Sequence, residues 1–321
     1  MAELFTSKYG LVEQAKRLDA NGDLAQIVEC LNREMGMILQ EAPWLMSNDV
    51  WVNKTTRRAS LNAGTKRALN QRITASVSRT TEIMDTIINI EDYCEPDAMY
   101  IDSMPNIDIA RAQEIDAFVE GMGQTLVSEI IYGADEADSM YGIEARLATV
   151  DGRFVIDGGG TGSDLTSILV VNWSPTMAHL IYPKNMEGFG IQHDDKGRVT
   201  SETSDGKMEV YRDHFKVRCG FVVRHPRAIG RLANIEVSGT DNTFDENDLI
   251  ALTNNVKRGA GSRIYVNDTM ITQMQIRSKD QSNRFFTQGG DMAGAPPLYF
   301  NRIPIRVIDR EILVNTEDAI S

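Results

Sequence analysis

One long amphipathic helix constrains the fold of this chain more than any other feature of its sequence. Between Asn106 and Tyr132, apolar residues recur at spacings of three and four and define one buried helix face: Ile115, Phe118, Val119, Met122, Leu126 and Ile130. Asn106 is a favourable N-cap, and Gly133 is a typical stop. A helix of about 26 residues is about 39 Å long, more than most globular helices. We therefore expect it to cross a whole domain as a spine.

Charge is segregated along the chain just before and within this helix. The net charge is −13, from 33 basic and 46 acidic residues. Residues 53–81 nevertheless contain no acidic residue and seven basic ones: Lys54, Arg57, Arg58, Lys66, Arg67, Arg72 and Arg79. Residues 82–120 contain one base, Arg111, and eleven acidic residues: Glu82, Asp85, Glu91, Asp92, Glu95, Asp97, Asp102, Asp108, Glu114, Asp116 and Glu120. Because the overall charge has the wrong sign for wrapping nucleic acid, general DNA binding is not indicated.

Two segments with strand propensity flank the basic block. Residues 49–56 and 80–93 are rich in β-branched and aromatic side chains, so we predict that they pair as a long two-stranded arm. An isolated hairpin is marginal in water, so such an arm needs a partner surface. Its positive charge has three possible explanations: docking on an acidic neighbour, a solvated loop, or contact with nucleic acid. The adjacent acidic block favours docking, because complementary potentials guide encounter and fix register between identical subunits.

The remaining chain is a mixture of predicted strands and helices. Strands are expected at 168–173, 178–182, 210–223 and 263–266, with a further pair of strand segments within 299–312 around Pro304. Capped helices are expected at 245–256 and 268–276, and another amphipathic helix within 11–40 that ends before Pro43. The chain should therefore have an α+β fold, and 321 residues are enough for about two domains.

A phosphate-binding or catalytic site is not indicated by the sequence. Residues 157–164 (DGGGTGSD) fit neither common phosphate-loop pattern, and they precede a strand, whereas a phosphate cradle precedes a helix. A loop or tight turn is the favoured interpretation. There is no GxSxG motif, and the four histidines have no recognised metal spacing: His179, His193, His214 and His225. We predict no catalytic residue, no cofactor and no metal.

Cysteine usage and hydropathy are typical of a protein that folds in a cytoplasm. Cys30, Cys94 and Cys219 are an odd number without a CxxC pair, so we interpret them as buried thiols. The chain has no basic-then-apolar leader and no apolar run of about 18 residues, so neither secretion nor a membrane span is expected.

Residues 158–236 resemble a known protein family. The matching segments are 158–173 (GGGTGSDLTSILVVNW), 183–184 (PK), 190–195 (GIQHDD), 211–220 (YRDHFKVRCG), 223–224 (VR), Arg227 and 231–235 (RLANI). Together they resemble the major capsid proteins of short-tailed bacteriophages of the epsilon-fifteen type. Outside this window the order of the expected elements agrees, but the residues are only loosely similar.

The resemblance implies the capsid fold of Hong Kong phage 97, with an arm, an extended loop, a peripheral domain with a spine helix, and an axial domain. The corresponding segments are 1–47 for the N-terminal arm, 48–97 for the extended loop, 98–142 for the spine region, 143–206 for axial or peripheral β segments, 207–240 for peripheral strands, and 241–321 for the axial domain and final strands. Because axial-type elements follow the peripheral strand, we expect a permuted connectivity.

The same resemblance implies a subunit that assembles with itself into pentamers and hexamers of an icosahedral phage head around double-stranded DNA, without sequence-specific DNA contacts. A portal protein, and a decoration or scaffolding protein, are further candidate partners. The residues selected for the subunit interface are Lys54, Arg57, Arg58, Lys66, Arg67, Arg72, Glu91, Asp92 and Glu95. Two alternatives are another phage structural protein, of tail or decoration type, and a cytoplasmic enzyme that uses the Gly-rich loop.

Overall fold

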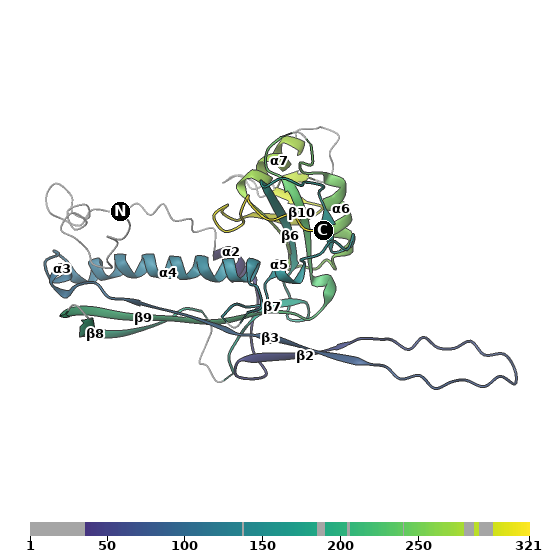
Figure 1. The fold of residues 1–321 in the computed structure, drawn as a ribbon, viewed down its shortest axis with the longest axis horizontal. Coiled ribbons are helices and arrows are strands. Elements are labelled where there is room, and N and C mark those ends of the chain that lie inside the picture. Colours follow the sequence, from purple (N-terminus) through teal and green to yellow (C-terminus); the bar gives the residue numbers. More distant parts are fainter. Residues whose placement is uncertain are drawn as a thin grey trace.

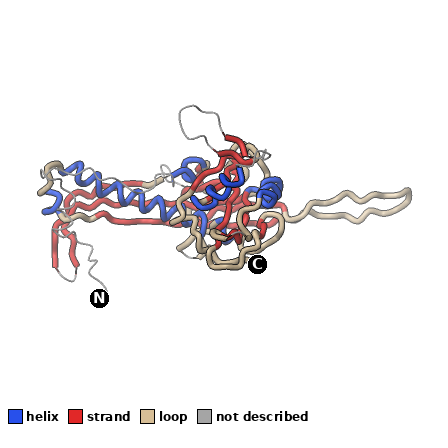
Figure 2. The backbone as a smooth tube through the Cα atoms, turned by 90° about the horizontal axis from the view of Figure 1, so that it is seen from above, coloured by secondary structure: helices blue, strands red, loops and turns tan. Residues whose placement is uncertain are grey.

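The molecule is elongated and has a two-part body from which a hairpin projects (Figure 1). The computed structural model describes residues 36–136, 138–184, 190–203, 206–239, 241–278, 286–288 and 298–321. One part of the body is the long helix α4 (Ile107–Tyr132) lying along a five-stranded sheet, and the other is a seven-stranded sheet with helices beside it. The hairpin extends away from both parts, as the view from above also shows (Figure 2). The predicted α+β class is confirmed.

Helix α4 has the length and the ends that the sequence predicts. The Asn106 side chain accepts two backbone N–H groups of the first turn, and the N–H of Gly133 donates to Glu129 O at the other end. Of the predicted apolar face, Met122, Leu126 and Ile130 are buried, Ile115 and Phe118 are partly buried, and Val119 is exposed. The prediction therefore included one residue, Val119, that lies outside the buried face of the helix.

The sheet beneath α4 is built on one long strand. Its order is β1 (Trp44–Met46), β7 (Ala178–Tyr182), β9 (Gly206–Val223) and β4 (Ile88–Cys94), with β8 (Gln192–Thr203) also pairing β9. Along β9, Phe215, Val217 and Cys219 are buried and alternate with less buried residues, because one face of the strand lies under the helix. There Phe215 stacks on Phe118 of α4 with ring centroids 6.4 Å apart. The short helix α3 (Ala98–Asp102) precedes α4.

The second sheet has a central strand that is buried on both faces. Its order is β12 (Phe286–Gln288), β13 (Leu298–Phe300), β14 (Ile303–Val307), β11 (Ser262–Val266), β6 (Leu165–Asn172), β10 (Ile229–Glu236) and β5 (Val155–Asp157). All eight residues of β6 are buried. Ile168 and Val170 share a core with α6 (Glu246–Asn255) and α7 (Asp268–Ser278), while Leu169 and Val171 share a core with α4. Strand β6 therefore joins the two parts of the body.

The segment 207–240 does not form one structural unit, contrary to our expectation. Strand β9 belongs to the five-stranded sheet, whereas β10 pairs antiparallel with β6 and parallel with β5 in the other sheet. A 3₁₀ turn, η2 (Pro226–Ala228), lies between them, with the His225 side chain accepting the N–H of Arg227. The run of hydrophobic residues gave no sign of this change of sheet, because both strands are equally apolar.

The segment 80–93 is likewise two strands rather than one. Strand β3 (Thr80–Thr86) pairs with β2 (Val52–Arg58), as predicted, but β4 leaves the hairpin and pairs with β9 from Ile88↔Cys219 to Cys94↔Asp213. Of the helix expected within 11–40, the structure describes α2 (Gly36–Glu41), which ends before Pro43. Residues 1–35, including Cys30, lie outside the described residues.

Candidate assembly surfaces

The projecting hairpin is a regular ladder that opens into a long loop. Seven residue pairs join β2 and β3, from Val52↔Thr86 to Arg58↔Thr80. Two bonds then continue the pairing, as the N–H groups of Ala59 and Ser60 both donate to Arg79 O. Residues 59–79 are all exposed, and the turn at the tip includes Asn70 with a φ of 68°. At about 3.3 Å per residue, eleven residues beyond Arg58 reach about 36 Å from the ladder.

The loop combines positive charge with exposed apolar side chains. Lys66, Arg67 and Arg72 lie on it, and Lys54 and Arg58 are exposed on the ladder. None of these five bases forms an ion pair with another residue in the described part of the chain. Four large apolar residues stand in solvent on the same loop: Leu61, Leu69, Ile73 and Val77, with Leu69 94% exposed. Among the residues that the structure describes, none covers this surface.

Arg57 differs from the other predicted interface bases because it faces the body. Its guanidinium donates to the carbonyl oxygens of Val223 at 2.8 Å and Arg224 at 3.2 Å. Across the ladder, the buried Asp85 of β3 binds Arg146 of the short helix α5 (Ile143–Arg146), with 2.6 Å between Oδ1 and Nη2. Arg57 is therefore an anchor of the hairpin within its own subunit.

The acidic residues selected for docking already have partners in the same chain. Glu91 accepts hydrogen bonds from Asn89 at 2.6 Å and His214 at 3.2 Å, and the Asn89 bond lowers its pKa. Glu95 is bound to Arg212 at 2.5 Å. Asp92 accepts the N–H of Tyr93 and has no ionic partner among the described residues. Two of the three acidic residues selected for docking are therefore bound within the same chain.

The Gly-rich loop is packed against β10 and offers no phosphate cradle. The N–H of Gly158 donates to Ala233 O at 2.8 Å, and that of Gly160 donates to Asn234 O at 2.9 Å. A Cβ on Gly160 would lie 2.6 Å from the same Asn234 oxygen, so glycine is needed for this close approach. Because these N–H groups are already bonded to the sheet, they are not available to bind a phosphate. The alternative that the chain is an enzyme using this loop therefore has no support from it.

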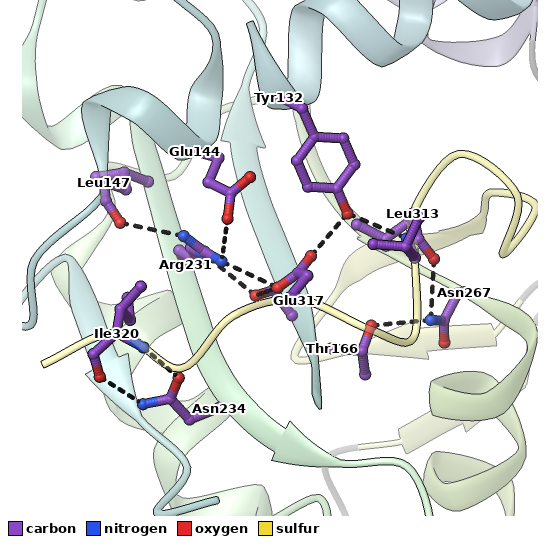
Figure 3. A network of polar contacts seen from close by, with 12 residues as sticks. Tyr132, Glu144, Leu147, Thr166, Arg231, Asn234, Asn267, Leu313, Glu317 and Ile320 are labelled. Atoms are coloured by element: carbon purple, nitrogen blue, oxygen red, sulfur yellow. Dashed lines mark hydrogen bonds and ion pairs between the residues drawn. The ribbon is translucent and has the colours of Figure 1, made fainter. Parts of the chain in front are cut away.

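A buried polar network joins the two parts of the body, and sequence reasoning missed it. Arg231 of β10 is 1% exposed and binds two carboxylates, Glu317 at 2.9 Å and Glu144 at 2.8 Å (Figure 3). The Tyr132 hydroxyl, at the end of α4, donates to Glu317 at 2.7 Å. Burial and the Glu317 charge raise the pKa of this phenol. A lone arginine in the apolar run 229–235 (IGRLANI) was the available signal.

Side chains from the sheet hold the segment 313–321 across this network. Asn267 donates to Leu313 O, and Asn234 both donates to Ile320 O at 2.8 Å and accepts the N–H of Ile320 at 3.0 Å (Figure 3). We call residues 313–321 the strap. It supplies the Glu317 carboxylate that lies between α4 and the seven-stranded sheet.

The part of the chain that the structure describes offers neither a metal site nor a membrane-spanning helix. No group of three or more His, Cys, Asp or Glu residues there is arranged to hold a metal ion. No helix there is both long and apolar enough to cross a bilayer.

A helical spine on a sheet, a second sheet and a projecting hairpin define the class of shell-forming proteins with the Hong Kong phage 97-like capsid fold. The match to a family extends over residues 19–321, and the family is described as major capsid protein GP7. The chain belongs to this family of phage major capsid proteins. It is a structural protein of the phage virion rather than an enzyme, and it assembles with copies of itself.

The chain is similar to several solved structures. A chain of the near-atomic-resolution cryo-EM structure of bacteriophage epsilon15 is 25% identical, with a TM-score of 0.73 over 100% of this chain and 99% of that one. The bacteriophage JBD30 capsid is 11% identical, with a TM-score of 0.48 over 97% and 96% of the two chains. The SrpI encapsulin of Synechococcus elongatus PCC 7942 is 10% identical, with a TM-score of 0.49 over 73% and 98%. A search of curated proteins gave no match.

Proposed function

We propose that this subunit forms pentamers and hexamers of a closed icosahedral head, and that its β2–β3 hairpin docks on a neighbouring copy. The observation that carries the proposal is the uncovered surface of residues 59–79, which is basic and apolar at once. In this proposal the head encloses double-stranded DNA without reading its sequence, since a net charge of −13 disfavours close binding to phosphates.

Apolar burial supplies the main driving force in this proposal. Burying a large aliphatic side chain fully stabilises a contact by about 1.5–3 kcal/mol, and the loop exposes four of them. Lys54, Arg58, Lys66, Arg67 and Arg72 add long-range attraction to an acidic neighbour and help to fix its register. Weak contacts of this kind are individually reversible, so misplaced subunits can leave before the shell closes.

The proposed acceptor surface on the neighbour consists of three acidic residues that differ in their contacts within the subunit. Among the three acidic residues selected for it, Asp92 keeps an uncompensated carboxylate, whereas Glu91 and Glu95 would have to exchange partners. Exchange of a surface ion pair costs little, because exposed pairs contribute only about 0–1 kcal/mol each. We therefore keep Glu91, Asp92 and Glu95 as proposed contacts, with Asp92 first.

The domain assignment follows the two sheets in this proposal. The five-stranded sheet with α4 is the peripheral domain, the seven-stranded sheet is the axial domain, and β10 belongs to the axial domain. A portal protein, and a decoration or scaffolding protein, are the proposed partners besides further copies of the chain. Interfaces of this kind are closed by rotational symmetry around five-fold and six-fold rings.

Charge reversal on the loop tests the docking proposal. The double variant Lys66→Glu with Arg67→Glu should fold normally but lose closed shells, as seen by electron microscopy and analytical sedimentation. The matched control, Lys257→Glu with Arg302→Glu, makes the same change in net charge at two exposed positions on the body that also have no ion pair among the described residues, and it should assemble. Normal shells from the loop variant, or rings and tubes of the tail type from the parent protein, would overturn the proposal.

A further inference from the structure

The hairpin leaves the body at a place where one edge of a sheet strand loses its partner. Strand β4 pairs with β9 only as far as Cys219, while β7 pairs with residues 220–223 of β9 on the opposite edge. Among the described residues, no strand continues the β4 side of β9 beyond Cys219. Backbone carbonyl groups on that edge need other hydrogen-bond donors, because unpaired buried backbone groups are costly.

Two arginines take the place of the missing strand. The Nη2 atom of Arg146 donates to Phe221 O at 3.1 Å, and that of Arg57 donates to Val223 O at 2.8 Å. Carbonyl groups two residues apart on a strand point to the same edge, so both guanidinium groups lie along one side of β9. Arg57 comes from β2 of the hairpin, whereas Arg146 comes from α5 of the body.

The buried carboxylate of Asp85 links one of these cations, Arg146, to the other strand of the hairpin. Asp85 is 1% exposed and binds Arg146 at 2.6 Å, and its Oδ2 atom finds no hydrogen-bond partner among the residues that the structure describes. Burial raises its pKa, although the charges of Arg146 and Arg57 oppose this. Arg146 is itself held by Tyr141, since its Nε donates to Tyr141 O at 2.9 Å and its guanidinium lies 4.3 Å from the ring centre.

The backbone of the hairpin also approaches β9 closely at this point. A Cβ on Gly220 would lie 2.6 Å from the carbonyl oxygen of Thr86, which is the last residue of β3. Each strand of the hairpin therefore has its own attachment: β2 through Arg57, and β3 through Asp85 and the contact at Gly220. Two attachment points, one on each strand, restrain a hairpin against both swinging and twisting.

We propose that Arg57, Asp85 and Arg146 are positioning residues that fix the direction in which the hairpin leaves the body. The inference rests on the proposed docking role of the hairpin, because a direction that varied would place the loop at varying points on the neighbour. It assigns to Arg57 a role distinct from that of Arg58, which follows it in sequence but lies on the opposite, exposed face of β2. The fixed direction then sets the angle between adjacent subunits and hence the curvature of the shell.

Conservative substitutions separate positioning from charge. Arg57→Lys keeps the positive charge but cannot hold two carbonyl groups with a planar fork. Arg58→Lys makes the same chemical change one residue away and is the matched control. Asp85→Asn keeps the size of the side chain and removes its charge, which provides a second test at the other attachment point.

The direct readout is the distance distribution between two spin labels on the dilute, unassembled full-length chain. Labels at Thr56→Cys on the ladder and Ala117→Cys on α4 occupy exposed positions. Cys30 is replaced by Ser, while Cys94 and Cys219 are buried and stay unlabelled. We expect one narrow distance peak for the parent and Arg58→Lys, and loss of that peak to a broad distribution for Arg57→Lys and Asp85→Asn.

Assembly provides the second readout. Arg57→Lys should still form particles, because its charge is kept, but they should lose the uniform diameter of the parent shells. A narrow peak for Arg57→Lys, a broad one for the parent, or equal broadening in Arg58→Lys would overturn the positioning role. These outcomes are measured on single subunits, so they are independent of the Lys66/Arg67 test, in which only the docking role can fail.

Discussion

Removal of the Glu317 side chain should destabilise the subunit more than any single change on its surface. Glu317 is one of the two carboxylates that bind the buried Arg231, the other being Glu144, and it also accepts hydrogen bonds from the hydroxyl groups of Tyr132 and Ser167. Glu317→Ala therefore leaves a buried guanidinium with half of its counter-charge and two hydroxyl groups without an acceptor. Glu317→Gln keeps an acceptor in place and removes only the charge.

The expected loss follows from these contacts. Removing one partner of a buried ion pair costs about 3–5 kcal/mol, and the lower end applies because Glu144 remains. Each of the two hydroxyl bonds contributes about 1 kcal/mol, so the total is about 5 kcal/mol. Unfolding entropy of about 2.1 cal/mol/K per residue gives about 0.7 kcal/mol/K for this chain, so the melting temperature of Glu317→Ala should fall by about 7 °C. Glu317→Gln should lose about half as much.

Differential scanning calorimetry of unassembled subunits at neutral pH measures this change. The matched control is Glu311→Ala, which removes an exposed glutamate from the residues just before the strap and should leave the melting temperature within about 1 °C of the parent. If Glu317→Ala also melted within about 1 °C of the parent, the assignment of Glu317 as a buried counter-charge would be wrong.

Three further predictions concern titration and the Gly-rich loop. Burial and the charge of Glu317 raise the pKa of Glu144 in the folded chain above its ordinary 4.5. The contribution of Glu144 to stability is therefore present at acid pH and is lost as the pH rises through the raised pKa. Glu144→Gln should flatten that part of the curve of stability against pH, measured by urea unfolding. Burial lowers the pKa of His179 to about 4 in the folded chain. Stability should therefore fall as the pH drops from 6.5 to 4, because His179 takes up a proton in the unfolded chain but not in the folded one. His179→Gln should remove this slope in the same titration. Gly160→Ala should lower the melting temperature, because the added Cβ would lie too close to the carbonyl oxygen of Asn234. Added nucleotide should leave the melting temperature of the parent unchanged. An increase with nucleotide would support the alternative that the chain is an enzyme.

The elements with strong local signals were predictable from the sequence. Helix α4 has a cap at Asn106, a stop at Gly133 and a continuous apolar stripe between them, so both its ends and its buried face could be assigned. The β2–β3 ladder and the exposed basic loop followed from strand propensity and charge. Local patterns of this kind depend on neighbouring residues, which a sequence displays directly.

The sheet assignments and the internal ion pairs were not predictable in the same way. Strands β9 and β10 are equally apolar, and only their long-range partners place them in different sheets. Arg57 has the same charge as Arg58, yet the two point to opposite faces of β2, and only the register of the strand decides which one is partly buried against the body. Glu91 and Glu95 were identified as acidic, but their pairing with His214 and Arg212 depends on residues more than a hundred positions away.

The strap determines when, during synthesis, a subunit can complete the contacts between its two parts. Residues 313–321 leave the ribosome after every strand that they contact, including β6 and β10. Until Glu317 arrives, Arg231 lacks one of its two counter-charges and α4 lacks its bond to the strap through Tyr132. Until translation has passed this point, a nascent chain therefore has only the shared apolar core around β6, without the polar network, to hold the spine against the second sheet.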